Sequence, residues 1–154
     1  MKAKAYLQEI RRLEGAITRN QQEKEILYAR LTGRAVSYEG DRARPSGSGD
    51  PMADVIAKVI ELDHEISRQT VSYFGRLHEI KGQIEQLDNE TFSKLLFKRY
   101  VKGKSLEVIA VEMNYTYSRV RHLHGLALRA FEERFAEEMA EYERQHTKAH
   151  PDVL

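Results

Sequence analysis

The stretch "SLEVIAVEMNYTYSRVRHLHG", Ser105 to Gly125, has the pattern of two short helices separated by a break at "MNYT". The break contains neither glycine nor proline. Asn114 lies where the chain must leave the first helix, and asparagine is the non-glycine residue that most readily takes a positive φ angle. Thr116 then provides an N-cap for the second helix, as Ser105 does for the first. We therefore expect a helix-turn-helix over this stretch.

The packing pattern of the stretch is consistent with that expectation. Two helices that cross steeply need a small residue at their contact, and Ala110 has the required size. The expected core positions between them are Ile109, Met113, Tyr115, Val120 and Leu123. All five are apolar or aromatic, so the two helices can bury a shared face.

The opposite face of the second helix is a candidate DNA-contacting surface. In helix-turn-helix proteins the N-terminal part of this helix enters the major groove. Arginine, serine and histidine there can hydrogen-bond base edges, and basic residues upstream can neutralise phosphates. The predicted base-facing residues are Tyr117, Ser118, Arg119, Arg121 and His122. The predicted phosphate contacts are Lys98, Arg99, Lys102, Lys104 and Thr116.

The charge distribution bears on whether this is a DNA-binding motif or a bent surface helix. The whole chain carries a net charge of +1, but residues 92–129 hold eight Lys or Arg and two acids, a net charge of +6. Residues 130–154 carry a net charge of −4. The positive segment coincides with the expected motif, which favours an anionic partner such as DNA. His122 and His124 are two positions apart, so we expect one to face DNA and one to be structural.

Two long apolar stripes precede the motif. The first, in residues 3–32, follows Tyr6, Ile10, Leu13, Ile17, Leu27 and Leu31, and Gly33 is the expected end of its helix. The second follows Val55, Val59, Leu62, Ile66, Gln69, Tyr73, Leu77, Ile80, Ile84 and Leu87, after Asp50 and Pro51 as a helix start. One helix cannot bury such a stripe alone. We expect a long antiparallel helical hairpin of coiled-coil type, although pairing between two subunits would bury the same stripes.

The remaining segments complete an all-α organisation. Residues 33–51 are rich in Gly, Ser, Pro and Asp and are expected to form a loop, either a flexible connector or an ordered loop that contacts a partner or DNA through Arg42 and Arg44. Asp88 or Asn89 caps a third helix, whose expected buried face is Phe92, Leu95, Leu96 and Tyr100. Apolar spacing then continues through Phe131, Phe135, Met139 and Tyr142, which predicts an extended C-terminal helix that either packs on the hairpin or forms a dimer seam. The predicted domains are a hairpin over residues 1–88 and a helix-turn-helix domain over 89–145, followed by a tail over 146–154.

Several classes of function lack the residues that they need. The chain has no cysteine, which excludes disulfides, thiolate metal sites and cysteine nucleophiles. No apolar run reaches about 18 residues, so no membrane span is expected. No nucleophile motif or phosphate-binding glycine loop is present, and we expect no enzyme, no catalytic residue and no cofactor. Glu61–His64 and Glu143–His146 have a Glu-x-x-His spacing that can bind metals in bundles, but their surroundings indicate exposed positions, so no metal is expected.

The segment "LLFKRYVKGKSLEVIAVEMNYTYSRVRHLHGLALRAFE" resembles region four of sigma factors, the C-terminal helix-turn-helix that binds the −35 promoter element. The likeness covers residues 92–132, with departures at Val108 and Gly125. Over nearly the full length, "AKAYLQEIRRLEGAI", "GDRARPSGSGDPMADVIAKVIELDHEI" and this C-terminal half resemble phage-encoded late transcriptional regulators of Gram-positive bacteria, the ArpU/RinA-like group. The resemblance implies activation of phage or prophage late genes in the bacterial host cytosol. Carried over by position, the base contacts would be Tyr117, Ser118, Arg121 and His122, two of which differ in type from the usual sigma residues.

Together these features predict a cytoplasmic, sequence-specific DNA-binding transcriptional regulator that forms a homo-oligomer. Its partner would be double-stranded DNA, with contact to RNA polymerase as a variant of the same hypothesis. The alternative is a protein-interaction adaptor, for example to RNA polymerase, in which the coiled coil is the working surface and the helix-turn-helix is structural.

Overall fold

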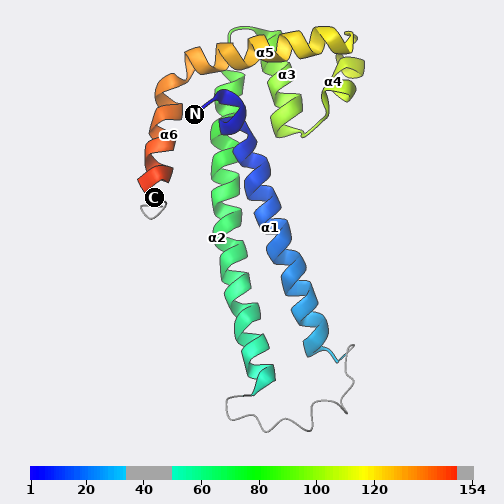
Figure 1. The fold of residues 1–154 in the computed structure, drawn as a ribbon, viewed down its shortest axis with the longest axis vertical. Helices are drawn as coiled ribbons and strands as arrows, with labels where there is room; N and C mark the ends of the chain where they lie inside the picture. Colours follow the sequence, from blue (N-terminus) through cyan, green and yellow to red (C-terminus); the bar gives the residue numbers. More distant parts are fainter. Residues whose placement is uncertain (34–49, 149–154) are drawn as a thin grey trace. The chain divides into compact units, whose positions relative to one another are not determined.

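The structure is a computed structural model that describes residues 1–33 and 50–148. These residues form helices and no strand, which confirms the predicted all-α class. A long antiparallel pair of helices is followed by shorter packed helices (Figure 1). The elements are α1 (Ala3–Leu31), α2 (Pro51–Glu85), α3 (Glu90–Leu96), a π-helical turn η2 (Phe97–Val101), α4 (Leu106–Met113), α5 (Tyr117–Arg134) and α6 (Ala136–Lys148). Within the described ranges, no helix combines the length and apolarity required to cross a bilayer.

The helix ends follow the capping residues. Asp50 Oδ1 accepts a hydrogen bond from the Met52 amide at 3.0 Å where α2 begins. Asn89 Oδ1 accepts from the Phe92 amide at 3.1 Å at the start of α3, so Asn89 rather than Asp88 is the cap. Gly33 has a φ of 75° just beyond the end of α1, as its position predicted. The predicted loop between these helices falls mainly on residues 34–49, which lie outside the described residues.

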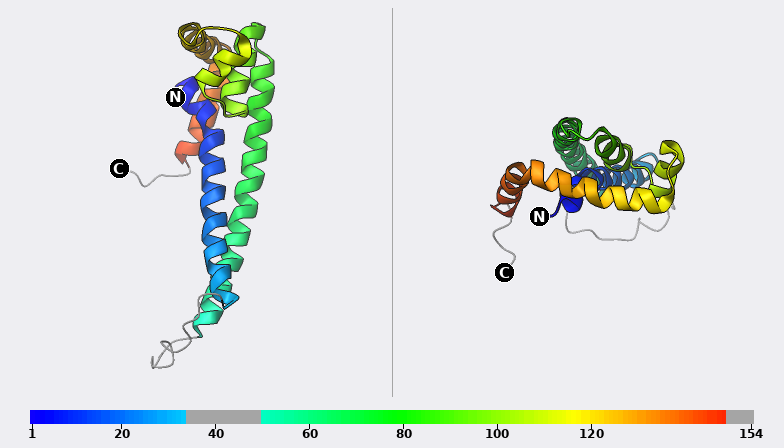
Figure 2. Two further views of the ribbon diagram at one scale, coloured as in Figure 1. Left: turned by 90° about the vertical axis from the view of Figure 1, so that its right-hand side faces the viewer. Right: turned by 90° about the horizontal axis from the view of Figure 1, so that it is seen from above.

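α1 and α2 lie side by side, as Figure 1 and the left view of Figure 2 agree. Every predicted stripe residue on both helices is buried or half-buried, so the helical hairpin is confirmed. The chain divides into two compact units, and one of them, Leu13–Tyr73, contains most of α1 and the first part of α2. There the polar stripe member Gln69 accepts a hydrogen bond from Asn20 Nδ2 at 3.0 Å, and Lys24 forms an ion pair with Asp63.

The other unit joins the first residues of α1 to the C-terminal half of the chain: it comprises Met1–Arg12 and Phe74–Leu154. Its largest fully buried side chains come from α1, α2, α3, α4, α5 and the residue after α5. They are Tyr6, Leu7, Ile10, Ile80, Ile84, Leu95, Leu96, Ile109, Val120, Phe131 and Phe135. The core beneath the helix-turn-helix therefore includes side chains from the opposite end of the sequence. The domain boundary predicted at residues 88 and 89 stays a prediction.

The predicted extended C-terminal helix is interrupted at Phe135. Its φ of −117° and ψ of 28° end α5, and α6 begins at the next residue. The Phe135 amide still donates to Phe131 O at 2.9 Å, and its carbonyl accepts from the Met139 amide at 2.9 Å. The bend has no proline or glycine. Its physical reason is burial, because it allows Phe135, Met139 and Tyr142 all to be buried in the same core. α6 extends to Lys148, beyond the expected start of the tail at residue 146.

Candidate nucleic-acid interface

The turn between α4 and α5 has the geometry that the sequence predicts. Asn114 lies in the left-handed region, with a φ of 57° and a ψ of 40°. The Tyr115 amide donates to Ala110 O at 3.0 Å and the Asn114 amide to Val111 O at 3.3 Å. This pair of bonds is the Schellman arrangement, which satisfies carbonyls that the end of a helix leaves free.

The caps on either side of this turn also match the prediction. Ser105 Oγ accepts from the Val108 amide at 3.3 Å, and Thr116 Oγ1 accepts from the Arg119 amide at 3.2 Å. Between the two helices Ile109, Ala110 and Val120 are buried, whereas the other expected core positions, Met113, Tyr115 and Leu123, are half-buried. Local sequence signals therefore fix where α4 ends and where α5 begins.

The first turns of α5 present the predicted base-facing residues to solvent. Tyr117, Ser118, Arg119, Arg121 and His122 are all exposed. Ser118, Arg121 and His122 are separated by three and four positions, so they share one helix face. Arg119 differs, because its Cζ lies 4.1 Å from the centroid of the Tyr115 ring. That cation–π contact holds Arg119 against the turn.

Two further residues on this face of α5 were not among the predicted contacts. Gly125 and Arg129 are exposed, and they continue the row begun by Ser118 and His122 in steps of three and four. A Cβ at Gly125 would meet no atom within 4 Å. The helical spacing alone could have identified Arg129 as a member of the candidate surface.

The predicted phosphate contacts other than Thr116 lie at and after the end of α3, and several already have protein partners. Lys98 Nζ is 2.8 Å from Glu112 Oε2, and Lys104 binds the other oxygen of the same carboxylate. Hydrogen bonds from Lys104 and Lys98 lower the pKa of Glu112. Arg99 Nη1 donates to Lys104 O at 3.0 Å. Lys102 is exposed, with its Nζ 5.9 Å from the Phe97 ring centroid. The sequence pattern did not identify Glu112, on α4, as the partner of these lysines.

The two histidines of the motif occupy different environments. His122 is exposed, whereas His124 is half-buried, with Nε2 2.9 Å from Tyr100 Oη. Burial, together with the positive charges of Arg99 and Lys4, lowers the pKa of His124. Burial raises the pKa of Tyr100 to about 12. The pair therefore joins α5 to the π-helical turn as neutral groups near pH 7.

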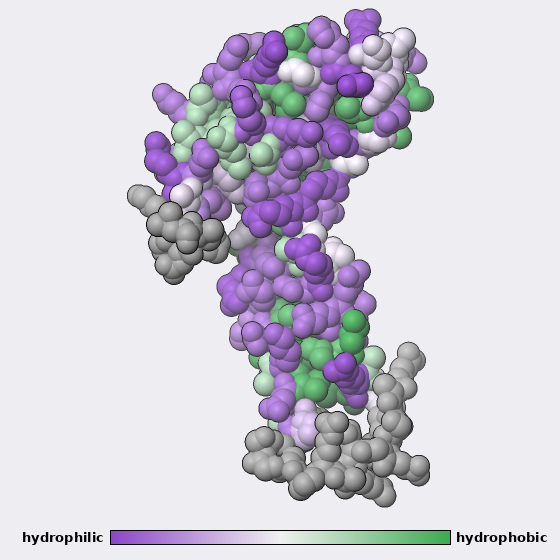
Figure 3. Space-filling model, in the orientation of Figure 1, coloured by the Kyte–Doolittle hydropathy of each residue, from purple (hydrophilic) through white to green (hydrophobic). Residues whose placement is uncertain are grey.

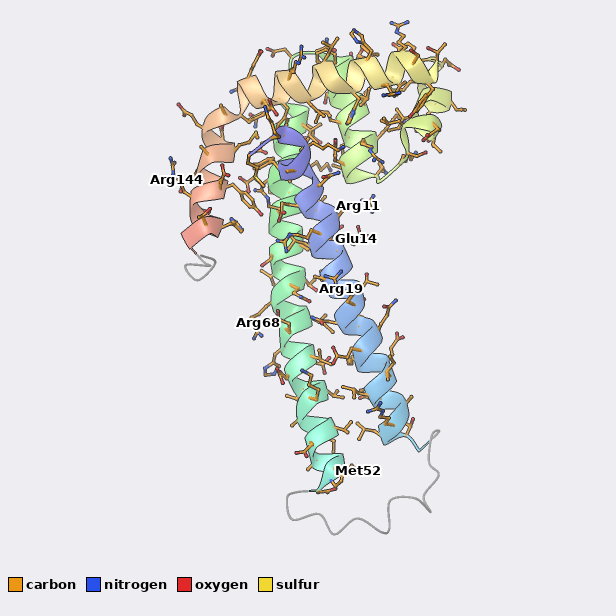
Figure 4. All side chains as sticks on the ribbon, viewed as in Figure 1. Arg11, Glu14, Arg19, Met52, Arg68 and Arg144 are labelled. Carbon is orange, nitrogen blue, oxygen red and sulfur yellow. The ribbon has the colours of Figure 1, made fainter. Side chains whose placement is uncertain are left out.

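Gly103, between Lys102 and Lys104, is required by two features of the structure. Its φ is 71°, a conformation that side chains disfavour. A Cβ there would lie 1.0 Å from Nη2 of Arg11, so the guanidinium group occupies that space. Arg11 projects from α1 (Figure 4), and the sequence pattern gave no indication of this contact.

No comparison with known proteins gives this chain a relative: no protein-family model, curated protein or solved structure matches it. The resemblance to sigma region four and to the ArpU/RinA-like regulators thus stays a prediction that rests on the quoted residues. Over residues 1–33 and 50–148, no group of three or more His, Asp or Glu side chains is arranged to hold a metal ion.

Proposed function

We propose that this protein is a sequence-specific DNA-binding transcriptional regulator of the bacterial cytosol, and that it activates phage or prophage late genes. The observation that carries the proposal is the α4–α5 turn, with Asn114 in the left-handed conformation and Thr116 as the cap of α5. Together they place Ser118, Arg121 and His122 on an exposed face at the N-terminal end of α5. This is the part of the motif that enters the major groove in helix-turn-helix proteins.

The local charge supports the same partner. Residues 92–129 carry a net charge of +6. This charge attracts the phosphate backbone of DNA, whatever the base sequence. Lys102 and Arg129 are exposed within this segment. The phage and late-gene part of the proposal rests on the resemblance stated above, as does contact with RNA polymerase.

The proposal can be tested by selection from a pool of random DNA duplexes, which requires no known operator. We expect the full-length protein to enrich a common sequence and to bind it in a salt-sensitive manner. Arg121→Ala should weaken binding to that sequence by about 1–3 kcal/mol, since a bidentate contact to guanine contributes that much discrimination. Fluorescence anisotropy of the labelled duplex measures the change.

Arg68→Ala is the matched control for that variant. Arg68 lies on α2, outside the candidate interface, and projects into solvent, where its partner is Glu65 (Figure 4). Its replacement should leave the affinity unchanged. Undiminished binding of Arg121→Ala would remove Arg121 from the interface, and a selection that enriches no sequence would contradict sequence-specific binding altogether.

A second candidate, the interaction adaptor, is favoured by one observation on the hairpin. Met52, Ile56 and Ile60 recur every fourth residue on α2 and are about half exposed, on a face different from the seam with α1. Apolar surface gathers over this end of the pair in Figure 3. A second copy of the chain would cover that face, which accords with the proposed homo-oligomer. Self-association in sedimentation experiments without any DNA binding would favour the adaptor.

A further inference from the structure

A shallow hollow beside α3 brings together four lysines, three of which were predicted from the sequence as phosphate contacts. Its volume is about 250 Å³. The residues that matter among those lining it are Glu85, Lys94, Phe97, Lys98, Lys102 and Lys104. We call this hollow the lysine pocket. Four ammonium groups and one carboxylate line it, so its lining carries a net positive charge.

The backbone explains why these lysines come together. Lys94, Lys98 and Lys102 are spaced by four residues, and the helix widens into the π-helical turn η2 between them. The Lys102 amide donates to Phe97 O at 3.0 Å, the five-residue step of that wider turn. Gly103 then reverses the chain with its positive φ, and the Lys104 amide donates to Lys98 O at 3.0 Å. Lys104, the fourth lysine, therefore also lines the pocket.

Carboxylates only partly balance this charge. Lys98 and Lys104 share the single carboxylate of Glu112. Lys94 pairs with Glu90 at 3.2 Å, but both side chains are more than 60% exposed, so that ion pair contributes little. Among the described residues Lys102 has a contact with the Phe97 ring and no carboxylate partner. Two lysines are therefore available to an incoming anion without loss of the Glu112 bridge.

We propose that the lysine pocket binds a phosphate group. Lysine binds phosphate as a point charge, and a doubly charged oxyanion matches two available lysines better than a single carboxylate does. The phosphate belongs either to a DNA strand or to a free phosphorylated compound. The first source rests on the proposed DNA-binding function, whereas the second is independent of it. Lys94 and Phe97 join the predicted contacts Lys98, Lys102 and Lys104 at one site.

The free source is tested with inorganic pyrophosphate and the full-length protein at constant ionic strength. We expect saturable shifts of the Lys102, Gly103 and Lys104 amide resonances in ¹H–¹⁵N spectra. The double variant Lys94→Gln/Lys102→Gln should weaken this binding about fivefold or more, because it removes the two lysines that Glu112 does not hold. Lys58→Gln, at an exposed lysine of α2 outside the pocket, is the control and should bind like the wild type.

The DNA source is tested with the same proteins and a duplex. If a strand phosphate occupies the pocket, the fall of log affinity with log salt should be less steep for the double variant. The slope should change by about 2, roughly one for each lysine removed. Weakened pyrophosphate binding, together either with an unchanged slope or with no DNA binding by the wild type, identifies a free phosphorylated ligand. Wild-type behaviour of the folded double variant in both experiments overturns the proposal. Thermal melting verifies that the variant is folded.

Discussion

Asn114 adopts a backbone conformation that most side chains avoid. Its φ of 57° is the only positive φ at a non-glycine residue in the described ranges. The left-handed conformation costs roughly 1–2 kcal/mol for an ordinary L-residue, and asparagine tolerates it better because its short polar side chain can hydrogen-bond locally. The identity of this one residue therefore affects whether α4 stops where the motif needs it to stop.

Replacement of Asn114 should expose this dependence. Asn114→Ala is expected to lower the free energy of unfolding by about 1 kcal/mol, because alanine resists a positive φ. Asn114→Gly should be nearly neutral, since glycine adopts that conformation without steric cost. Urea denaturation of both variants measures the difference. Equal stability of the two variants would show that the turn can be formed without the left-handed conformation.

The sequence predicted the caps and the turn between α4 and α5 correctly, but it did not predict the contacts between side chains of different elements. Ser105, Asn114 and Thr116 act on neighbouring backbone groups, so their roles follow from local spacing. The Lys98 and Lys104 contacts with Glu112 depend on how the π-helical turn η2 and the residues after it pack beside α4, which no local pattern encodes. For the same reason Arg11 could not be placed against Gly103 from the sequence.

Among the elements, α5 shows both what helical periodicity predicts and what it does not. Its buried face and its exposed face follow the spacing of three and four residues from Val120 to Phe131. The bend at Phe135 could not be predicted from this spacing, because the apolar spacing continues through it and neither proline nor glycine marks it. The chain bends there because the core of the unit, and not the local sequence, offers burial to Phe135 and Tyr142.

The contact between α5 and the π-helical turn predicts a dependence of stability on pH. His124 has a folded-state pKa below its ordinary value of 6.5. As the pH falls below 6.5, the imidazole of His124 takes up a proton in the unfolded chain but resists protonation in the folded protein. The free energy of unfolding therefore falls with decreasing pH. His124→Gln should reduce the slope of stability against pH between about pH 7 and pH 5. Thermal melting across that range measures it.

His122 offers the control for this experiment, because it is exposed in the same helix. His122→Gln should retain the wild-type slope. A slope that His124→Gln leaves intact would assign the pH dependence to other groups.

On the scale of the whole molecule, the unit that holds the helix-turn-helix is discontinuous in sequence. Tyr6 contacts three side chains from far along the chain. Its ring centroid is 5.8 Å from that of Phe131 and 5.5 Å from that of Tyr142. Its hydroxyl donates a hydrogen bond to Gln83 Oε1 at 2.9 Å. Arg76 completes the cluster, with Cζ 4.2 Å from the Tyr6 ring centroid and 3.7 Å from that of Tyr142. The apolar stripes predicted the long helices, but they did not decide whether the C-terminal segment packs on the hairpin.

A fragment limited to residues 89–148 should therefore fold poorly. Without residues 1–12 and the end of α2, it would expose Phe131, Phe135 and Tyr142, each of which is less than 10% exposed in the intact chain. We expect the fragment to bind a hydrophobic dye and to lack a cooperative thermal transition, whereas the full chain should show the transition and bind little dye. Cooperative unfolding of the fragment near the full-chain midpoint would instead establish an autonomous C-terminal domain.

The discontinuous unit also matters during synthesis. Tyr6 leaves the ribosome before α2 is made, and its aromatic partners Phe131 and Tyr142 follow more than 120 residues later. At elongation rates of about 5–20 residues per second, that interval is of order ten seconds. For that time the apolar face of the first helix lacks the cover it has in the finished protein. Until the C-terminal helix has been translated, the nascent chain therefore exposes apolar side chains of the kind that holding chaperones bind.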